Sequence, residues 1–212
     1  MIIRMSNELG NQMFMYSFAF SMSKKLNRIL LIDNETAFMS SKNISKYGLN
    51  NFDLSADIAP NNLKFKFLSG YLKRKFLIKT DKFRIKKNFF IEKKDKNKIT
   101  KYDNSLINVK FKDDIFIEGH FESEKYFIDF KKEIKDQFKF KDLELLKKNN
   151  FYKFLNKENS VAICLRQNRF IEGNNQNNIE NKKKSDQFSI EQIDYINKAV
   201  LYLKDKLPKP IF

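Results

Sequence analysis

The sequence predicts an α/β fold in which parallel strands alternate with helices. A short apolar run over residues 2–5 leads through a turn containing Gly10 into a long apolar segment, the order of strand, turn and helix. The predicted strand 28–33 contains a continuous apolar run, 29–32, as expected of a parallel strand covered on both faces. Apolar runs at 115–119 and 161–166 are each followed by helical patterns, so the same alternation returns twice.

The first three elements make one βαβ unit. We expect a strand at 2–5, a helix at 12–27 and a strand at 28–33. The helix is apolar nearly all round, which predicts burial on most of its faces. Lys24 and Lys25 fall in its last turn, where the helix dipole favours positive charge.

The central part of the chain carries weaker signals. We interpret the basic and aromatic stretch 63–90 as one or two helices with a solvated lysine face, and 91–100 as a charged loop. After the strand at 115–119, Ser123 is a candidate cap for a helix reaching about residue 138. A further helix is predicted over 142–155.

The C-terminal part begins with a predicted buried strand at 161–166. A polar loop at 167–187, with a mobile part at 173–184, precedes a helix at 189–207 that Pro208 and Pro210 end. Residues 211–212 would begin another strand. We therefore divide the chain into domains 1–157 and 158–212, and we expect the second domain to be truncated, because one strand and one helix cannot close a sheet.

Composition excludes several classes of protein. The single cysteine rules out a disulfide framework, and we find neither a signal peptide nor an apolar run of the ~20 residues that a membrane span needs. We expect a cytoplasmic protein, with peripheral contact at the inner membrane as an extension of that location. The net charge of +16 raises nucleic acid as a partner. Because the lysines are interspersed with asparagine, isoleucine and phenylalanine, we attribute them to coding bias and expect no nucleic-acid partner.

Three stretches are candidate sites. Gly10, Asn11 and Gln12 place backbone N–H groups and two amides at the carboxyl end of a strand, where ligands of α/β sheets bind. An ordinary turn with Asn11 as helix cap explains them equally well. The stretch lacks the GxGxxG pattern, so we predict no NAD.

The second stretch is a strand end that carries Arg166, Gln167 and Arg169. A guanidinium fork suits a diphosphate, although a surface ion pair explains such an arginine too.

The third stretch contains the only histidine, His120, between Glu118 and Glu122. This grouping is compatible with general acid–base work or with a structural histidine. No stretch has metal-ligand spacing, so we expect no metal site.

Together these stretches resemble the bacterial α-1,2-fucosyltransferases of glycosyltransferase family 11. Residues 7–17 (NELGNQMFMYS) resemble the family's GGLGNQMFQYA block, and residues 119–127 (GHFESEKYF) resemble its GYFQSEKYF block. Residues 164–169 (CLRQNR) hold the place of its HxRRxD block, directly after the predicted strand.

The resemblance implies a GT-B-like enzyme with a Rossmann-type N-terminal domain on the acceptor side and a Rossmann-type GDP-sugar-binding domain. Such an enzyme inverts configuration, needs no metal or cofactor, and moves L-fucose from GDP-fucose to the 2-hydroxyl of a galactoside. The acceptor would be a galactose-terminated glycan, free or lipid-linked, in surface-glycan or lipopolysaccharide synthesis. Arg166 would meet the donor's diphosphate, with Gln167 and Arg169 beside it. Independently of the resemblance, His120, Glu118 and Glu122 are candidates for the base because they lie at a strand end.

The chain departs from the family pattern at Asn7, Glu8, Cys164, Gln167 and Arg169. These changes leave open a different sugar nucleotide or acceptor. The family also has motifs beyond the equivalent of residue 212, so we expect this chain to be weakly active or inactive by itself. A non-enzymatic basic module that binds nucleic acid or an anionic membrane is the alternative from another class.

Overall fold

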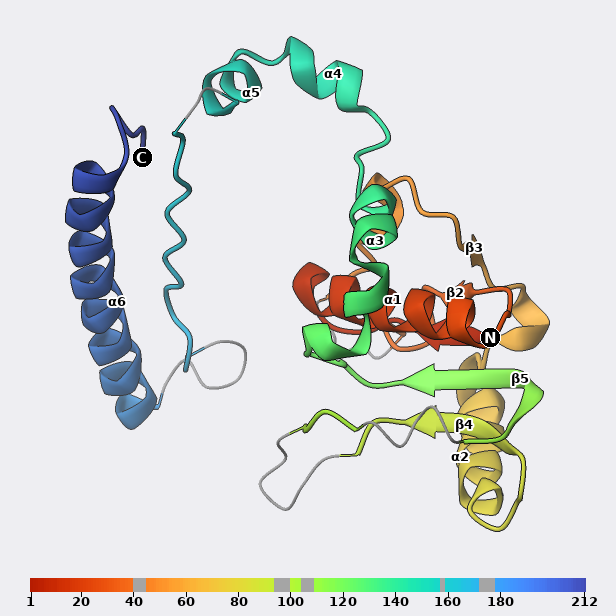
Figure 1. The fold of residues 1–212 in the computed structure, drawn as a ribbon. Helices are drawn as coiled ribbons and strands as arrows, with labels where there is room; N and C mark the ends of the chain where they lie inside the picture. The colour runs from red at the N-terminus through yellow and green to blue at the C-terminus, as the bar shows by residue number, and fades with distance from the viewer. Residues whose placement is uncertain (40–44, 94–99, 104–108, 157–158, 172–177) are drawn as a thin grey trace. The chain divides into compact units, whose positions relative to one another are not determined.

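The protein is described by a computed structural model that covers residues 1–39, 45–93, 100–103, 109–156, 159–171 and 178–212. Contacts divide the chain into two compact units, Met1–Asp142 and Leu143–Phe212. The division falls ahead of the boundary drawn after residue 157, because the two helices that precede that boundary group with the C-terminal part. Figure 1 traces both units.

The first unit is an α/β domain around a five-stranded sheet in which every pairing is parallel. The strands lie in the order β3-β2-β1-β5-β4, which is compatible with a Rossmann-like fold. Its strands and helices are β1 (Ile2–Arg4), α1 (Leu9–Lys25), β2 (Leu31–Asp33), β3 (Asp57–Ile58), α2 (Phe67–Asp81), β4 (Lys87–Ile91), β5 (Phe111–Glu118) and α3 (Lys131–Gln137).

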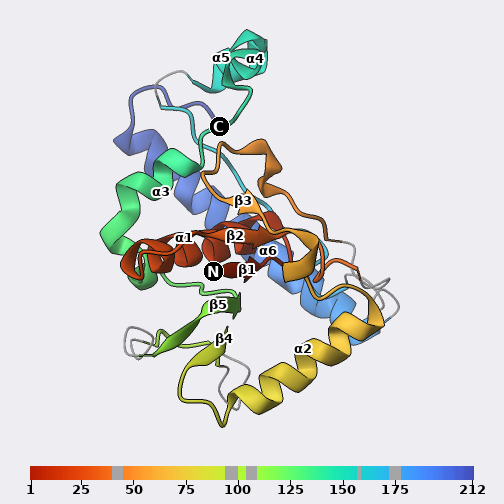
Figure 2. The same cartoon turned by 90° about the vertical axis from the view of Figure 1, so that its right-hand side faces the viewer.

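Helices cover both faces of this sheet. Figure 2 shows α1 and α3 on one side of the strands and α2 on the other. The main core lies under α1, where Ile3, Ile32 and Ile117 meet Tyr16 and Phe18 of the helix. On the opposite face, the rings of Phe65, Phe89 and Phe116 pack against one another. Residues alternate between faces along a strand, so the core uses one set and the aromatic cluster the other.

Helix α1 confirms the predicted burial but begins earlier than expected. Its residues from Met15 to Ser23 are buried, and Lys24 and Lys25 occupy its last turn. The helix starts at Leu9, with Glu8 as an extended N-cap residue, so Gly10 and Asn11 belong to its first turn. The expectation that they form a separate turn was wrong, and their N–H groups are among the free donors of a helix start.

The prediction of helices throughout 63–90 was only half right. Residues Phe67–Asp81 are helical, whereas Lys87–Ile91 form the edge strand β4. Pairing with β5 places the Phe89 ring against Phe116, a contact distant in sequence that local periodicity does not reveal.

The helix expected after Ser123 is broken into 3₁₀ turns at Glu124–Tyr126 and Ile128–Phe130, followed by α3. At the break, the Ser21 hydroxyl of α1 donates to the Tyr126 carbonyl at 3.1 Å, which ties this segment to the core. The Tyr126 side chain is itself buried.

The second unit contains α4 (Leu143–Lys148), α5 (Asn150–Leu155) and α6 (Ile179–Lys206). The predicted buried strand at 161–166 is instead an exposed extended segment, with 48% of Ile163 accessible. Among the described residues, its strand-like pairing is one parallel bridge between Ser160 and Ile211, with Val161 N–H donating to the Ile211 carbonyl at 2.8 Å. A strand needs neighbours to satisfy its backbone, and one bridge does not provide them.

Helix α6 spans 28 residues and begins well before the predicted start at residue 189. Asn178 caps it by accepting from the Asn181 N–H, and Lys184 pairs with Glu180 at 2.6 Å one turn apart. Residues 179–184 have no apolar face, and local capping and ion pairing stabilise their helical conformation. Of the part predicted to be mobile, 173–184, residues 173–177 lie outside the described residues and 179–184 are helical. None of the helices in the described ranges is long and apolar enough to cross a bilayer.

Candidate functional site

The carboxyl ends of β1 and β5 define the candidate site. These strands are direct neighbours in the sheet, with Ile2 opposite Phe116 and Ile3 opposite Ile117. Because they run in parallel, the segments that leave them emerge at the same edge. The sheet therefore brings the first and the third candidate stretches together, although more than a hundred residues separate them.

Four polar side chains meet at this edge, and we call Asn7, Asn11, His120 and Glu122 the amide–histidine cluster. The Asn7 amide lies 2.5 Å from His120 Nε2, and Asn11 Nδ2 donates to Glu122 Oε1 at 2.9 Å. The same Glu122 oxygen lies 3.7 Å from His120 Nδ1. The histidine thus has a carboxylate at one ring nitrogen and an amide at the other. Its side chain keeps 28% of its surface accessible.

Glycine and strain shape this edge. Gly119 adopts a φ of +150°, which L side chains rarely adopt. A Cβ built there would lie 2.3 Å from the Glu92 Cβ. Asn7 and Phe121 also have positive φ, at 60° and 53°. Such backbone persists only where surrounding contacts hold it, and it is frequent at functional sites.

Glu92, at the end of β4, supplies those contacts. Its buried carboxylate accepts the His120 N–H at 2.7 Å and the Phe121 N–H at 3.1 Å. Its own N–H donates to the Glu118 carbonyl at 2.8 Å. The sequence interpretation placed Glu92 in a charged loop and missed this role. The available signal was an acidic residue directly after the apolar run Phe89–Phe90–Ile91.

Gln12 lies in this region but faces the interior. Its side chain is fully buried; Nε2 donates to the carbonyls of Asn7 and Lys46, at 2.7 and 2.8 Å, and Oε1 accepts the Gly48 N–H at 2.9 Å. The Gln12 amide thus forms its hydrogen bonds with the backbone of this chain and stabilises the turn that contains Asn7. Gly10, by contrast, faces open space, because a Cβ added at this residue would have no heavy atom within 4 Å.

We expect Gln12→Leu to lower the free energy of unfolding by about 2–3 kcal/mol. The substitution keeps the volume roughly constant but leaves two carbonyls and one N–H without their buried partner. Urea denaturation monitored by circular dichroism measures the change. Asn11→Ala is the matched control from the same turn, with an expected loss below about 1 kcal/mol because its amide meets an exposed carboxylate. Equal losses in the two variants would contradict this assignment.

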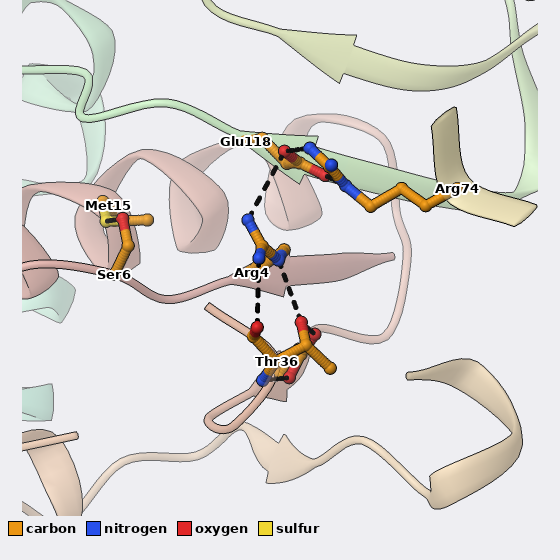
Figure 3. A network of polar contacts seen from close by, with 7 residues as sticks. Arg4, Ser6, Met15, Thr36, Arg74 and Glu118 are labelled. Atoms are coloured by element: carbon orange, nitrogen blue, oxygen red, sulfur yellow. Dashed lines mark hydrogen bonds and ion pairs between the residues drawn. The ribbon is translucent and has the colours of Figure 1, made fainter. Parts of the chain in front are cut away.

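A second polar group lies on the other face of the sheet (Figure 3). Arg74 of α2 makes a two-pronged contact with the Glu118 carboxylate, with Nε to Oε1 at 2.6 Å. Arg4 lies 3.8 Å from the same carboxylate and donates to the Thr36 hydroxyl at 2.9 Å. Burial lowers the pKa of the Arg4 guanidinium, and Glu118 acts in the opposite direction. The two guanidiniums hold Glu118, so this residue serves as an anchor beside His120.

Asp33 ends β2, where dinucleotide-binding folds place a carboxylate for the ribose. Here the side chain is buried and turned into its own loop, with Oδ1 accepting the N–H groups of Glu35 and Thr36 at 3.1 and 3.0 Å. The Thr36 hydroxyl donates to its other oxygen. This carboxylate is therefore engaged in a turn that positions Thr36 against Arg4.

The remaining candidate residues lie in the second unit. Arg166 sits on the exposed extended segment, where its backbone N–H and carbonyl pair with the Gln192 side chain of α6 at 3.2 and 2.8 Å. Gln167 is exposed. The Arg169 guanidinium lies over the Phe188 ring, 5.0 Å from its centroid. Cys164, which lies on the same extended segment, is exposed rather than buried.

In the ranges that the structure describes, no three histidine, cysteine or acidic side chains gather in a way that would hold a metal ion. The amide–histidine cluster has hydrogen-bonding groups and one base suited to a hydroxyl-bearing ligand. Comparison of the chain with protein-family models, with curated proteins and with solved structures found no match.

Proposed function

We propose that this chain is a sugar-nucleotide-dependent glycosyltransferase of the α-1,2-fucosyltransferase type. The observation that carries the proposal is the convergence of the two sequence blocks that resemble that family. Asn7 and Asn11 come from the first block and His120 and Glu122 from the second, and direct contacts join them at one edge of the sheet. Of these four residues, Asn11 is the one that matches the family block, so the convergence concerns the blocks and not the family's own side chains.

The cluster suits deprotonation of a sugar hydroxyl. In an inverting transfer, a base removes the proton of the acceptor hydroxyl as its oxygen attacks the anomeric carbon, and the sugar–phosphate bond breaks. In our proposal the acceptor hydroxyl takes the place of the Asn7 amide at His120 Nε2, and this nitrogen accepts the hydroxyl proton, while Glu122 near Nδ1 orients the ring and stabilises the imidazolium that forms. The Asn7 and Asn11 amides contribute hydrogen bonds to the sugar. This assignment places the acceptor at the first unit.

The donor side of the proposal rests on Arg166, with Gln167 and Arg169 next to it. Charge grows on the β-phosphate as GDP leaves, and a guanidinium stabilises that charge. From the family resemblance, we propose GDP-fucose as donor and the 2-hydroxyl of a galactoside as acceptor within a GT-B architecture. On the same ground we propose a cytoplasmic enzyme of surface-glycan or lipopolysaccharide synthesis that uses no metal.

The direct test is turnover of GDP-fucose with a panel of galactosides. We expect GDP release that depends on the acceptor, at a low rate for this chain by itself, with a product in which fucose is joined to the galactose 2-hydroxyl. Other sugar nucleotides offered in parallel identify a different donor. Absence of both donor binding and turnover with every sugar nucleotide would contradict the proposal.

We expect Arg166→Ala to lower kcat/KM by more than about tenfold, equivalent to roughly 1.4 kcal/mol of lost transition-state stabilisation. The guanidinium would be lost from the departing diphosphate while the fold of the first unit stays intact. Lys183→Ala, which removes an exposed cation of α6, is the matched control and should retain the parental rate. Unchanged kinetics in Arg166→Ala would remove this residue from the donor site.

A further inference from the structure

Helix α2 and the turn that follows it carry an unusual surface. Large apolar side chains of the helix are exposed, with 73% of Leu68, 56% of Leu72 and 65% of Phe76 accessible. The turn continues this surface with Phe83 and Ile85, of which 88% and 87% are accessible. Soluble proteins rarely leave so many large apolar side chains together in water, so we expect this surface to bind a partner.

The exposed charges that this segment itself carries have one sign. Exposed lysines accompany the apolar side chains along the helix and the turn, namely Lys73, Lys75, Lys79, Lys82 and Lys86. Within the described residues, none of these five makes an ion pair with a carboxylate. Asp81 is the sole acidic residue between positions 64 and 87, and it is buried. No exposed negative charge therefore offsets the lysines in this segment.

The buried Asp81 holds the turn in place. Its carboxylate accepts the N–H groups of Asn88 and Phe89, at 2.8 and 3.1 Å. Lys87 Nζ donates to the carbonyls of Asp81 and Lys82, at 2.9 and 3.1 Å. These hydrogen bonds stabilise the exposed turn that carries Phe83 and Ile85 beside the edge strand. Burial of the two side chains against a partner would therefore require little new ordering of the backbone.

We propose that this surface, formed by the exposed face of α2 and the turn at 82–86, docks on an anionic lipid bilayer. Leucine, isoleucine and phenylalanine enter the boundary between headgroups and acyl chains, and the lysines meet lipid phosphates. The inference does not depend on the proposed glycosyl transfer, since the surface lies on the opposite side of the sheet from α1.

Other occupants fit these residues less well. A nucleic acid would satisfy the lysines but would leave Leu68, Leu72 and Ile85 without an apolar partner, since aliphatic side chains offer no ring for base stacking. A second copy docked through the same surface would set lysines against lysines. A bilayer with anionic lipids satisfies both the apolar side chains and the charges.

The test is co-sedimentation of the full chain with vesicles of phosphatidylcholine alone or mixed with phosphatidylglycerol. We expect binding to the mixed vesicles that weakens at high salt, and little binding to phosphatidylcholine alone. The triple variant Leu68→Ser, Leu72→Ser, Phe76→Ser removes apolar area. The triple variant Lys73→Glu, Lys79→Glu, Lys82→Glu reverses charge. Each should lower partitioning at least about tenfold. The first variant loses the burial of three large apolar side chains, and in the second each lysine at the surface contributes roughly fivefold.

The matched control reverses the same number of charges elsewhere, in Lys182→Glu, Lys183→Glu, Lys204→Glu on α6, and should stay within about twofold of the parent in moderate salt. All substituted side chains are exposed, and circular dichroism verifies that the variants fold. An equal loss in the control would overturn the proposal in favour of diffuse charge. Full binding by the apolar variant, failure of the parent to bind the mixed vesicles, or binding of DNA in place of vesicles would also overturn it.

Discussion

Gly119→Ala should lower the free energy of unfolding by roughly 2–4 kcal/mol. Two independent causes act at this position. The backbone has a φ of +150°, and the added methyl group would lie 2.3 Å from the Glu92 Cβ and 2.9 Å from a Glu92 carboxylate oxygen. Relief of that clash would move Glu92 away from the His120 and Phe121 N–H groups that it accepts, leaving buried donors without partners.

Gly10→Ala is the matched control for this substitution. The space beside Gly10 is open, and the residue lies in the first turn of α1, where alanine is a better helix former. We expect its stability to be unchanged or higher by up to about 1 kcal/mol. Thermal and urea unfolding measure the stability of the two variants. Equal stability of both would show that the backbone at Gly119 and its contact with Glu92 differ from those described here. If a ligand occupies the open space at Gly10, the alanine variant will bind that ligand less well while it remains fully folded.

His120→Ala should reduce kcat for glycosyl transfer by about 10²-fold or more, the usual contribution of a positioned general base. The substitution removes the only histidine of the chain, and with it the imidazole that would accept the hydroxyl proton. Steady-state kinetics at saturating donor measure the change in kcat. An unchanged kcat in the variant would exclude His120 as the base.

Substitutions of two glutamates in the same block distinguish an effect on the orientation of His120 from an effect of surface charge in general. Glu122 contacts both Asn11 and His120, whereas Glu124 makes an exposed ion pair with Lys131 at 2.9 Å. We expect Glu122→Gln to lower kcat about tenfold with little change in stability, since the ring loses its carboxylate neighbour. Glu124→Gln should leave kcat at the parental value. Equal effects of the two substitutions would remove Glu122 from the site.

Much of the site could be anticipated because its residues follow strands. The positions of His120, Glu122 and Asn11 after β5 and β1 were visible in the apolar runs that precede them. Glu92 and Arg74 were not visible as partners, because they come from a charged stretch and a basic helix, and periodicity does not say which distant residue a side chain will meet. Gln12 was predicted at the site, and the structure places its amide in the interior, bonded to the backbone.

Elements that depend on local chemistry could be predicted from the residues alone. The apolar run and turn that make β1 and α1, the lysines at the end of α1, and the prolines that follow α6 all act through neighbours along the chain. Tertiary structure alone decided that Lys87–Ile91 would be a strand, that the segment over 161–166 would lack a ladder, and that Arg4 and Arg74 would share Glu118. The physical reason is that a strand and an ion pair both need a partner, and the fold, rather than the neighbouring residues, supplies it.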